Sequence, residues 1–541
     1  MTIKRNNKHI ASLVKEAVSL ALKDFYCPPV PDPEVSVGKA RKTMFYITEG
    51  SWKVHINVNE IPPLEERELV KFFRSICRHE LGHYTVCPYD MTNSLLILRS
   101  VMKNVGPELA GFVANFFCDL IVDHYLFERY REETLWEKKV TANWIANCFD
   151  YPSELWALLI KCYEKMWNVK ILEDLRVAMV VDEVAAKIVK VIKRGGVFNE
   201  KTWPRKAGKV AEIIRNFLEW VRRGEEASYD GFTVPEDVAK MMRGDPLKPP
   251  LGRSGDYEKA AEKYIEEGGR VEEFVETIRA ARLNKNTREI LRAWYRAKAK
   301  LRIKVKISSV RRRKEDVQVY PDVWRIEDPL EELDIPLSLQ CFPKLIPGLT
   351  TKKWVKSSSE TVKEKGEPPD MLIVLDSSSS MSSNDGLPFD LALVAAFSAL
   401  KFAMSKNCRV AAINFSNGVI ECYWTRDRVK VEDVLLSYQG GGTVLPTKRI
   451  SKLVEENGFK VLVLIITDTG LANWDEAVKE LGRLVAMGHS VCMFFIGGRE
   501  GELNEAHRKF LSMGGKIYPI PDIEKLPDVV IDEVKGHYQV G

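Results

Sequence analysis

Two histidines and a glutamate lie within one helical turn of each other in the N-terminal part of the chain. Residues 79–83 read His-Glu-Leu-Gly-His. On a helix, His79 and His83 share a face and can hold one metal ion, while Glu80 lies beside a metal-bound water whose proton it can accept. Zinc in such a site lowers the pKa of its bound water and polarises a carbonyl group for attack. The pattern predicts a zinc site with Glu80 as general base.

A third metal ligand is expected from the next helix, where Asn115, Asp119 and Asp123 share one face. The other residues of this helix are mainly apolar, and burying two carboxylates among them without a cation is costly. We predict Asp119 as the ligand and Asp123 as an alternative ligand or as a partner that orients one. His124 is a weaker candidate because it is rotated off this face. The competing interpretation is that these histidines and aspartates are partly exposed and solvated.

A second group of oxygen-bearing side chains follows predicted strands in the C-terminal part. It comprises Asp376, Ser378 and Ser380 in an Asp-x-Ser-x-Ser pattern, Thr443 after three glycines, and Asp468 at the end of the most apolar strand. Parallel strands deliver such residues to one edge of the sheet, where ligands of doubly wound folds bind. Oxygen-only ligands suit magnesium or manganese. Taken singly, a serine-rich loop or a run of glycines is more often a flexible linker or a turn.

The elements that position the histidines and aspartates follow from apolar periodicity. We expect a hairpin, two helices and then a mostly helical region, at residues 42–48 with 52–58, 64–84, 107–130 and 153–224. Two stretches rich in Pro, Gly or Ser predict a loop and a linker, at residues 243–257 and 356–370.

The elements of the C-terminal part alternate between strands and helices. The strands are expected at residues 371–375, 410–415, 460–467 and 490–496, with helices after residue 388 and over 473–487. This rhythm predicts a mostly parallel sheet with helices on both faces.

The oxygen-bearing residues and their strands resemble a von Willebrand factor A (VWA) domain over about residues 369–525. The resemblance implies a complete metal-ion-dependent adhesion site. In it, Asp376, Ser378 and Ser380 are ligands from the first loop, Thr443 from the second and Asp468 from the third. A carboxylate of a partner protein would complete the coordination of the metal. The family often has Gly directly after the last Asp, whereas here Thr469 precedes Gly470.

The hairpin before the histidine helix resembles the zincin arrangement. Together with a VWA domain, it resembles a prokaryotic group of metallopeptidase-like proteins that are associated with MoxR-type AAA+ ATPases. This implies a multidomain chain with an α+β zincin-like metal-binding domain at 1–150 and a helical domain at 151–255. A basic helix, strands and linker would follow at 256–368, and a doubly wound α/β (Rossmann-like) VWA domain at 369–541.

The implied function is that of a partner of such an ATPase in protein remodelling, maturation or degradation. A zinc peptidase site would act on a client, and the VWA site would bind an acidic residue of the client or the ATPase. The alternative is a non-catalytic adaptor in which only the VWA site functions.

A basic segment lies between the two groups of ligands. Residues 279–314 carry 15 Lys or Arg against one acid, Glu289. We expect a long polar helix at 271–300, followed by a half-solvated strand at 301–307, where apolar and basic residues alternate. Three interpretations are open: a solvated surface, a site for an acidic protein partner, or a site for a nucleic-acid backbone. Nucleic acid is the least favoured because no aromatic platform for base stacking accompanies the charges.

The overall composition is that of a globular protein. The chain has 541 residues with 29% charged and 45% hydrophobic residues, and its net charge of +5 is too small to indicate a nucleic-acid binder. No apolar run approaches the ~18 residues of a membrane-spanning helix, and no signal peptide is apparent. Ten scattered cysteines without a CxxC pair indicate reduced thiols, so we expect a cytoplasmic protein that does not associate with membranes. The high content of Lys, Arg and Glu fits a thermophilic source.

Overall fold

The computed structural model divides the chain into two units, Met1–Trp294 and Tyr295–Gly541. It describes residues 7–26, 28, 35–38, 45–48, 53–57, 61–148, 154–173, 178–226, 254–281, 286–313, 318–328, 330–341, 344–356, 368–382, 387–468 and 471–538. Most of the predicted linker at 356–370 and of the predicted loop at 243–257 lies outside the described residues, as do Thr469 and Gly470. The predicted boundaries of the four segments stay a prediction.

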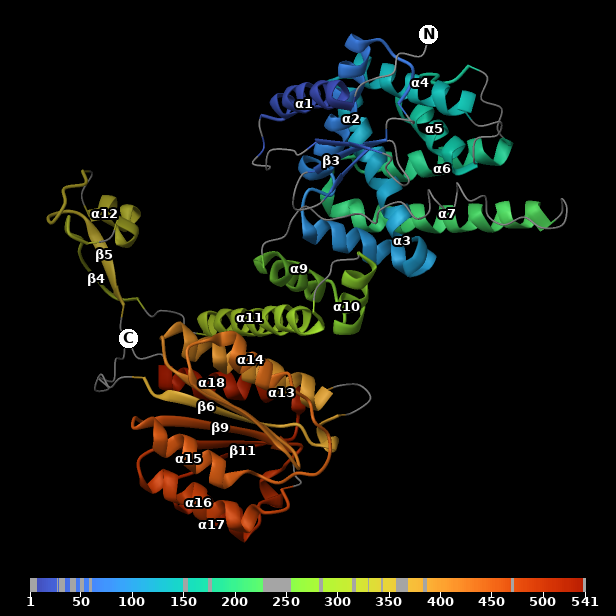
Figure 1. Cartoon of the computed structure of the whole chain (residues 1–541). Coiled ribbons are helices and arrows are strands. Elements are labelled where there is room, and N and C mark those ends of the chain that lie inside the picture. The colour runs from blue at the N-terminus through green and yellow to red at the C-terminus, as the bar shows by residue number, and fades with distance from the viewer. Residues whose placement is uncertain are drawn as a thin grey trace. The chain divides into compact units, whose positions relative to one another are not determined.

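The first unit is built mainly of helices (Figure 1). They are α1 (Asn7–Asp24), α2 (Glu66–Thr85), α3 (Met91–Arg129), α4 (Arg131–Cys148), α5 (Glu154–Trp167), α6 (Met179–Lys193), α7 (Trp203–Glu226), α9 (Ser254–Glu266) and α10 (Val271–Ala280). Apolar faces of α1 and α2 pack together in one core, with Val14 and Phe72 fully buried. Helix α2 begins with a capping box between Glu65 and Glu68, which satisfies backbone N–H groups that have no partner within the helix.

A small sheet accompanies these helices, with strand order β1–β3–β2. The predicted hairpin is present: β2 (Phe45–Thr48) and β3 (Lys53–Asn57) pair antiparallel. Strand β1 (Val35–Gly38), which adds to β3 in parallel, was not expected from the sequence.

Helix α3 carries the two aspartates and is interrupted near its middle. Gly106 has a positive φ of 75° and is followed by Pro107, which has no N–H to donate. The second half of α3 corresponds to the helix predicted over residues 107–130, and most of its apolar residues are buried.

Helices α2 and α3 approach each other closely at Gly82, within the histidine motif. A Cβ atom added to Gly82 would lie 2.4 Å from Cγ1 of Val122 on α3. The missing side chain at Gly82 therefore permits the contact that brings the histidines of α2 next to the aspartates of α3.

The basic segment forms a helix where the sequence predicted a strand. Helix α11 runs from Thr287 to Arg313, so the strand expected at residues 301–307 is wrong, and the expected helix at 271–300 is instead α10 and the first half of α11. Leu301–Ile307 does alternate between apolar and basic residues, but only over seven positions. A helix already formed by good helix formers extends through it at little cost, since each added residue gains a hydrogen bond.

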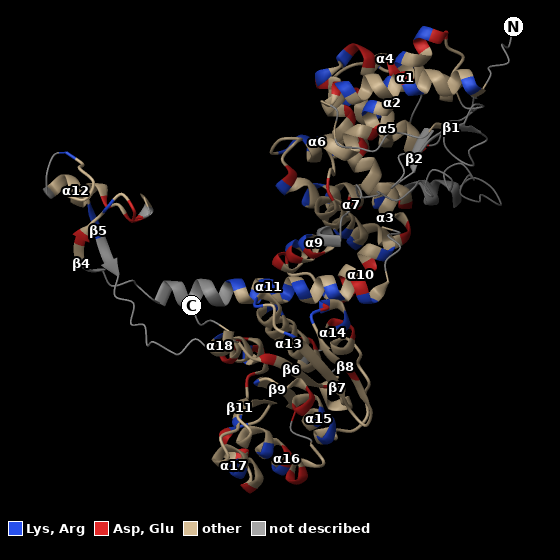
Figure 2. Ribbon diagram, turned by 60° about the vertical axis from the view of Figure 1, so that its left-hand side comes forward, with Lys and Arg blue, Asp and Glu red and all other residues tan. Residues whose placement is uncertain are grey.

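Several charges of α11 are paired within the second unit. The ion pairs are Arg296–Glu432 at 2.6 Å, Lys298–Asp390 at 2.6 Å and Arg302–Asp528 at 2.9 Å. Figure 2 shows the basic residues along α11. The side chain of Glu432 is completely buried, and Arg296 contacts it through both carboxylate oxygens. Part of this basic surface is therefore neutralised by acidic residues of the same chain.

The second unit contains a six-stranded sheet with the order β11–β10–β9–β6–β7–β8. Its strands are β6 (Asp370–Asp376), β7 (Val410–Phe415), β8 (Val419–Thr425), β9 (Val461–Asp468), β10 (Ser490–Ile496) and β11 (Lys516–Ile520). All neighbouring pairs are parallel except β7–β8. The sheet is therefore mostly parallel, as predicted, although strands β8 and β11 were not expected.

Helices cover both faces of this sheet (Figure 1). They are α13 (Leu387–Ser405), α14 (Arg428–Leu435) and α18 (Leu526–Tyr538) on one face, and α15 (Thr447–Asn457), α16 (Trp474–Ala486) and α17 (Glu505–Ser512) on the other. Among the six strands of this sheet, β6 comes first in the sequence. In the sheet, β7 lies on one side of β6 and β9 on the other. The strand order therefore reverses between β6 and β9, where doubly wound folds open a crevice for ligands.

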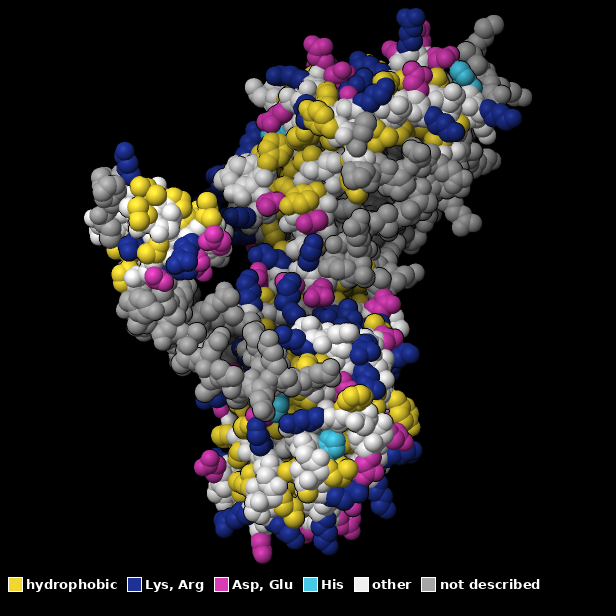
Figure 3. Space-filling view, turned by 90° about the vertical axis from the view of Figure 1, so that its left-hand side faces the viewer, with side chains coloured by type: hydrophobic (Ala, Val, Ile, Leu, Met, Phe, Trp, Pro, Cys, Tyr) yellow, Lys and Arg dark blue, Asp and Glu magenta, His cyan; other side chains and the backbone are white. Residues whose placement is uncertain are grey.

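A smaller element of the second unit combines the antiparallel strands β4 (Gln318–Val323) and β5 (Lys352–Lys356) with helix α12 (Ile335–Cys341). Trp324 and Thr351 are buried in it, whereas Ile326, Leu330 and Leu349 are each about 70% exposed. Figure 3 shows hydrophobic side chains gathered on this element.

Two helices in the described part of the chain are long and apolar enough to cross a membrane by length and composition, α3 and residues Pro388–Ser405 of α13. The structure buries 56% and 61% of their most apolar windows. Core helices of soluble proteins meet the same criteria, so neither helix by itself indicates a membrane span.

Replacing Gly82 by Ala is expected to lower the free energy of unfolding of the first unit by about 1–3 kcal/mol, because the new methyl group overpacks the contact with Val122. Chemical denaturation followed by circular dichroism measures the change. Gly536 in α18 is the control: a methyl group added there would meet no atom within 4 Å, so Gly536→Ala is expected to be neutral or stabilising. A Gly82→Ala variant as stable as the parent would contradict the close packing of α2 and α3.

Candidate functional sites

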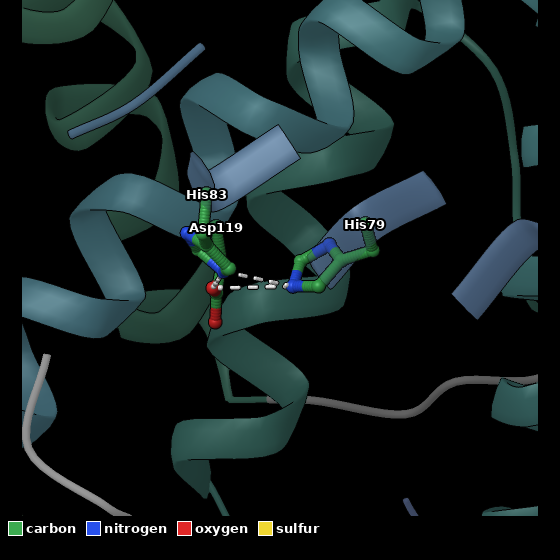
Figure 4. A group of neighbouring side chains, drawn as sticks. All are labelled: His79, His83 and Asp119. Carbon is green, nitrogen blue, oxygen red and sulfur yellow. Dashed lines mark hydrogen bonds and ion pairs between the residues drawn. The ribbon is translucent and has the colours of Figure 1, made fainter. Parts of the chain in front are cut away.

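The histidine pair of α2 faces Asp119 of α3 (Figure 4). The Nε2 atoms of His79 and His83 lie 3.1 Å apart, and Oδ1 of Asp119 lies 3.4 Å from the first and 3.0 Å from the second. Ligands of a tetrahedral zinc ion with bonds of about 2.0–2.1 Å are about 3.3 Å apart. The three atoms are therefore spaced as three ligands of one small metal ion.

Hydrogen bonds at Nδ1 orient both imidazole rings, on the side away from Asp119. Nδ1 of His79 donates to Oδ1 of Asp123 at 2.7 Å, and Nδ1 of His83 donates to the backbone carbonyl of Cys87 at 3.1 Å. A carbonyl can only accept, as can an ionised carboxylate, so each neutral ring carries its proton on Nδ1. The lone pairs of both Nε2 atoms then point toward Asp119, where a metal would accept them.

The carboxylate of Asp119 has an unsatisfied oxygen. Its Oδ2 accepts a hydrogen bond from Asn115 at 3.1 Å, but its buried Oδ1 has no hydrogen-bond partner with good geometry among the described residues. Burial disfavours the charged form of Asp119, yet its contacts with His79 and His83 outweigh burial and lower the pKa of Asp119. Such an oxygen next to two imidazole nitrogens fits a cation.

Asp123 lies behind His79 and is 1% exposed. Its second oxygen, Oδ2, is 3.0 Å from Nζ of Lys138 on α4 and accepts a hydrogen bond from the hydroxyl of Tyr163 on α5. Burial alone would raise the pKa of Asp123, but Lys138 and His79 reverse the effect and lower it. The structure thus brings Asp119, rather than Asp123, to the two Nε2 atoms.

The sequence did not single out Lys138 or Tyr163. Lys138 is followed by Lys139, and no local pattern distinguishes the two; Tyr163 lies within an apolar stripe of α5. Their roles depend on contacts with Asp123, which lies 15 and 40 residues away from them in the sequence.

Two other predicted residues lie outside the group of three ligand atoms. Glu80 is half-buried on the same turn of α2 as the histidines. His124 points elsewhere: its Nε2 lies 3.3 Å from Glu128, and its ring stacks on Phe198.

The second group of predicted residues gathers at the carboxyl edge of the large sheet, where the strand order reverses. Asp376 ends β6 and Asp468 ends the neighbouring strand β9. Oδ1 of Asp376 accepts from the backbone N–H of Ser378 at 2.8 Å, and Oδ2 accepts from the hydroxyl of Thr467 at 2.6 Å. Burial raises the pKa of Asp376, and the nearby carboxylate of Asp468 acts in the same direction, although these hydrogen bonds oppose it.

The loops at this edge are tied to one another. The hydroxyls of Ser378 and Ser380 are 3.1 Å apart. The backbone of Gly441 joins Ser379 in both directions, accepting from its N–H at 2.9 Å and donating to its hydroxyl at 2.8 Å. Thr443, on the same glycine loop, is 9% exposed.

Asp468 is the unsatisfied member of this edge, because its buried Oδ1 has no hydrogen-bond partner among the described residues. An oxygen-only group with one unpartnered carboxylate oxygen fits a hard divalent cation. That these side chains ligate one ion stays a prediction.

Comparisons with known proteins add little to this geometry. No protein-family model matches the sequence, and no curated protein matches it either. Among solved structures, the chain is similar to the pilus adhesin SpaC from Lactobacillus rhamnosus GG, at 12% identity with TM-scores of 0.28 and 0.25 in two crystal structures. The matches span 33% and 32% of this chain and 31% and 30% of the adhesin. Likenesses of this size carry no inference about fold or function.

Zinc is expected to raise the thermal unfolding midpoint of the first unit, because a ligand that binds only the folded state stabilises it by about 2.7 kcal/mol at 100 times its Kd. Asp119→Asn should remove most of this gain by removing a charged ligand, whereas Asp182→Asn, at an exposed ion pair with Lys165, should retain it. Differential scanning calorimetry measures the midpoints. Equal stabilisation of the parent and Asp119→Asn would contradict the site.

Proposed function

We propose that this chain is a zinc metallopeptidase-like protein with a second, protein-docking metal site. The observation that carries the proposal is the convergence of two imidazole Nε2 atoms and one carboxylate oxygen within 3.4 Å of one another. These three protein ligands leave a position for water or substrate, which is typical of catalytic rather than structural zinc sites.

The charges around the histidines support a divalent cation. Three carboxylates and one ammonium group form a connected, largely buried network: Asp119, Asp123, Glu137 and Lys138. Counted with neutral histidines, the form that binds metal, this network carries two unbalanced negative charges. Without a cation, burial would lower the pKa of His79, but Asp123 and Asp119 outweigh burial and raise it. One divalent ion neutralises the network, which removes the cost of burying uncompensated charge.

The chain's own residues have distinct roles in this proposal. His79, His83 and Asp119 hold the ion, and Asp123 and the carbonyl of Cys87 orient the rings. Zinc bound there would supply an activated water and polarise a peptide carbonyl. Glu80, on the same turn as both ligands, is the carboxylate that would accept the proton of the attacking water.

The second site is proposed as a docking site of the VWA type, with magnesium or manganese bound by Asp376, Ser378, Ser380, Thr443 and Asp468. What supports it is the oxygen of Asp468 that has no partner among the described residues, at the point where the strand order reverses. An acidic residue of a partner would complete the coordination. By the resemblance to VWA proteins, the partner is a MoxR-type AAA+ ATPase or its protein client, in the cytoplasm.

The alternative function is a non-catalytic adaptor in which only the second site acts. It shares the docking chemistry of the main proposal but assigns the histidine site a structural role. Nucleic acid is not the proposed partner, since Arg296, Lys298 and Arg302 of the basic helix already contact carboxylates of the chain.

Glu80→Gln separates catalysis from metal binding. We expect the variant to retain one zinc per chain, because Glu80 is not a ligand, and to cleave fluorescein-labelled casein at least ~100-fold more slowly, the usual loss on removing a general base. The His79→Ala/His83→Ala double variant should lose both zinc and cleavage. Cleavage that survives Glu80→Gln would rule out this mechanism. A parent that binds zinc but cleaves nothing would favour the adaptor.

Asp376→Ala tests the docking site independently of zinc. We expect it to abolish magnesium-dependent binding of a purified MoxR-type ATPase from the same organism, measured by surface plasmon resonance with and without magnesium. Glu456→Ala, near the end of α15 that precedes strand β9, is the control and should bind normally. Binding that is unaffected by both magnesium and Asp376→Ala would contradict the proposed site.

A further inference from the structure

Asp123 is a buried carboxylate with polar partners on three other helices. It is 1% exposed on an apolar helix and makes three close polar contacts, each with a different helix: His79 on α2, Lys138 on α4 and Tyr163 on α5. An ionised carboxylate so deeply buried is costly unless charge and hydrogen bonds compensate it. Lys138, 16% exposed, supplies the charge, and its other carboxylate contact is Glu137 at 3.3 Å.

The two oxygens of Asp123 have different partners. Oδ2 forms an ion pair with Lys138 and accepts a hydrogen bond from the hydroxyl of Tyr163. Oδ1 accepts a hydrogen bond from Nδ1 of His79. With Oδ2 held by two donors, the carboxylate cannot rotate toward the position between the histidines without breaking both contacts. Oδ1 thereby faces the ring of His79 and fixes the proton on Nδ1.

We propose that Asp123, held by Lys138 and Tyr163, is a positioning residue of the histidine site that sets its affinity for zinc. This inference rests on the proposed zinc site. Lys138 and Tyr163 act through Asp123: they keep its carboxylate behind His79, which keeps the lone pair of Nε2 directed at the metal and makes Asp119 the ligand. Hydrogen-bond partners of this kind typically change metal affinity by 10–100-fold when they are removed.

The competing explanation is that Asp123 and Lys138 only hold α3, α4 and α5 together. The two explanations differ for a triple variant. Asp123→Asn alone removes the 3.0 Å ion pair with Lys138, which keeps only Glu137 at 3.3 Å, so it should destabilise the fold. Adding Lys138→Met and Glu137→Gln removes the remaining charges of this buried group, so the triple variant should recover much of the lost stability. It does not restore the carboxylate behind His79.

The experiment measures two quantities for the full chain: the thermal unfolding midpoint without metal, and the zinc Kd from competition with a chromophoric chelator. We expect Asp123→Asn to lower the midpoint and to raise the zinc Kd by 10–100-fold. The Asp123→Asn/Lys138→Met/Glu137→Gln variant should recover the midpoint while its zinc Kd stays raised by at least ~10-fold. Recovery of both quantities in the triple variant would overturn the proposal.

Two further variants keep the result unambiguous. Tyr163→Phe removes a single hydroxyl group and should weaken zinc binding several-fold even if the triple variant does not fold; an unchanged Kd in this variant would contradict the role of Tyr163. The pair Asp182→Asn/Lys165→Met removes an exposed ion pair of the same unit and should leave zinc affinity unchanged. If the parent chain itself binds no zinc, the proposed function fails first, which distinguishes that failure from a failure of this inference.

Discussion

The close approach of α2 and α3 at Gly82 is the constraint on which the histidine site depends. Because Gly82 has no side chain, Val122 of α3 can pack directly against α2. The same packing buries Asp123 and partly buries Asp119 among apolar residues, where an isolated carboxylate is unstable. Asp123 is satisfied by Lys138, Tyr163 and His79, whereas the oxygen of Asp119 that faces both histidines has no hydrogen-bond partner among the described residues.

The carboxyl edge of the large sheet also brings two carboxylates close together, but the side chains around them offer only oxygen atoms. Parallel strands β6 and β9 end side by side at the reversal of strand order, which places Asp376 near Asp468. Hydrogen bonds satisfy Asp376, whereas one oxygen of Asp468 stays unpartnered among the residues that the structure describes. The nitrogen and oxygen donors of the first proposed site suit zinc and the oxygen-only donors of the second suit magnesium or manganese, so we expect the two sites to prefer different ions.

The sequence predicted helices and strands correctly where a long apolar pattern, or a proline that interrupts a helix, marked them. It failed where a short alternating pattern lay within a longer helix. The buried strands β6, β7, β9 and β10 and the second half of α3 were all expected. The alternation at Leu301–Ile307 was misleading, because α11 continues through it and Arg302 meets Asp528. The partners of the basic residues could not be predicted, since Glu432 is 136 residues from Arg296.

The sequence by itself determined which side chains share a face or an edge. The spacing of His79 and His83, the spacing of Asp119 and Asp123, and the position of Asp376 after an apolar strand follow from the local geometry of helices and strands. Only the tertiary structure decided which aspartate meets the histidines and which is held away from them. That choice depends on Lys138 and Tyr163, which reach Asp123 from two other helices, and local backbone geometry carries no information about how separate helices pack.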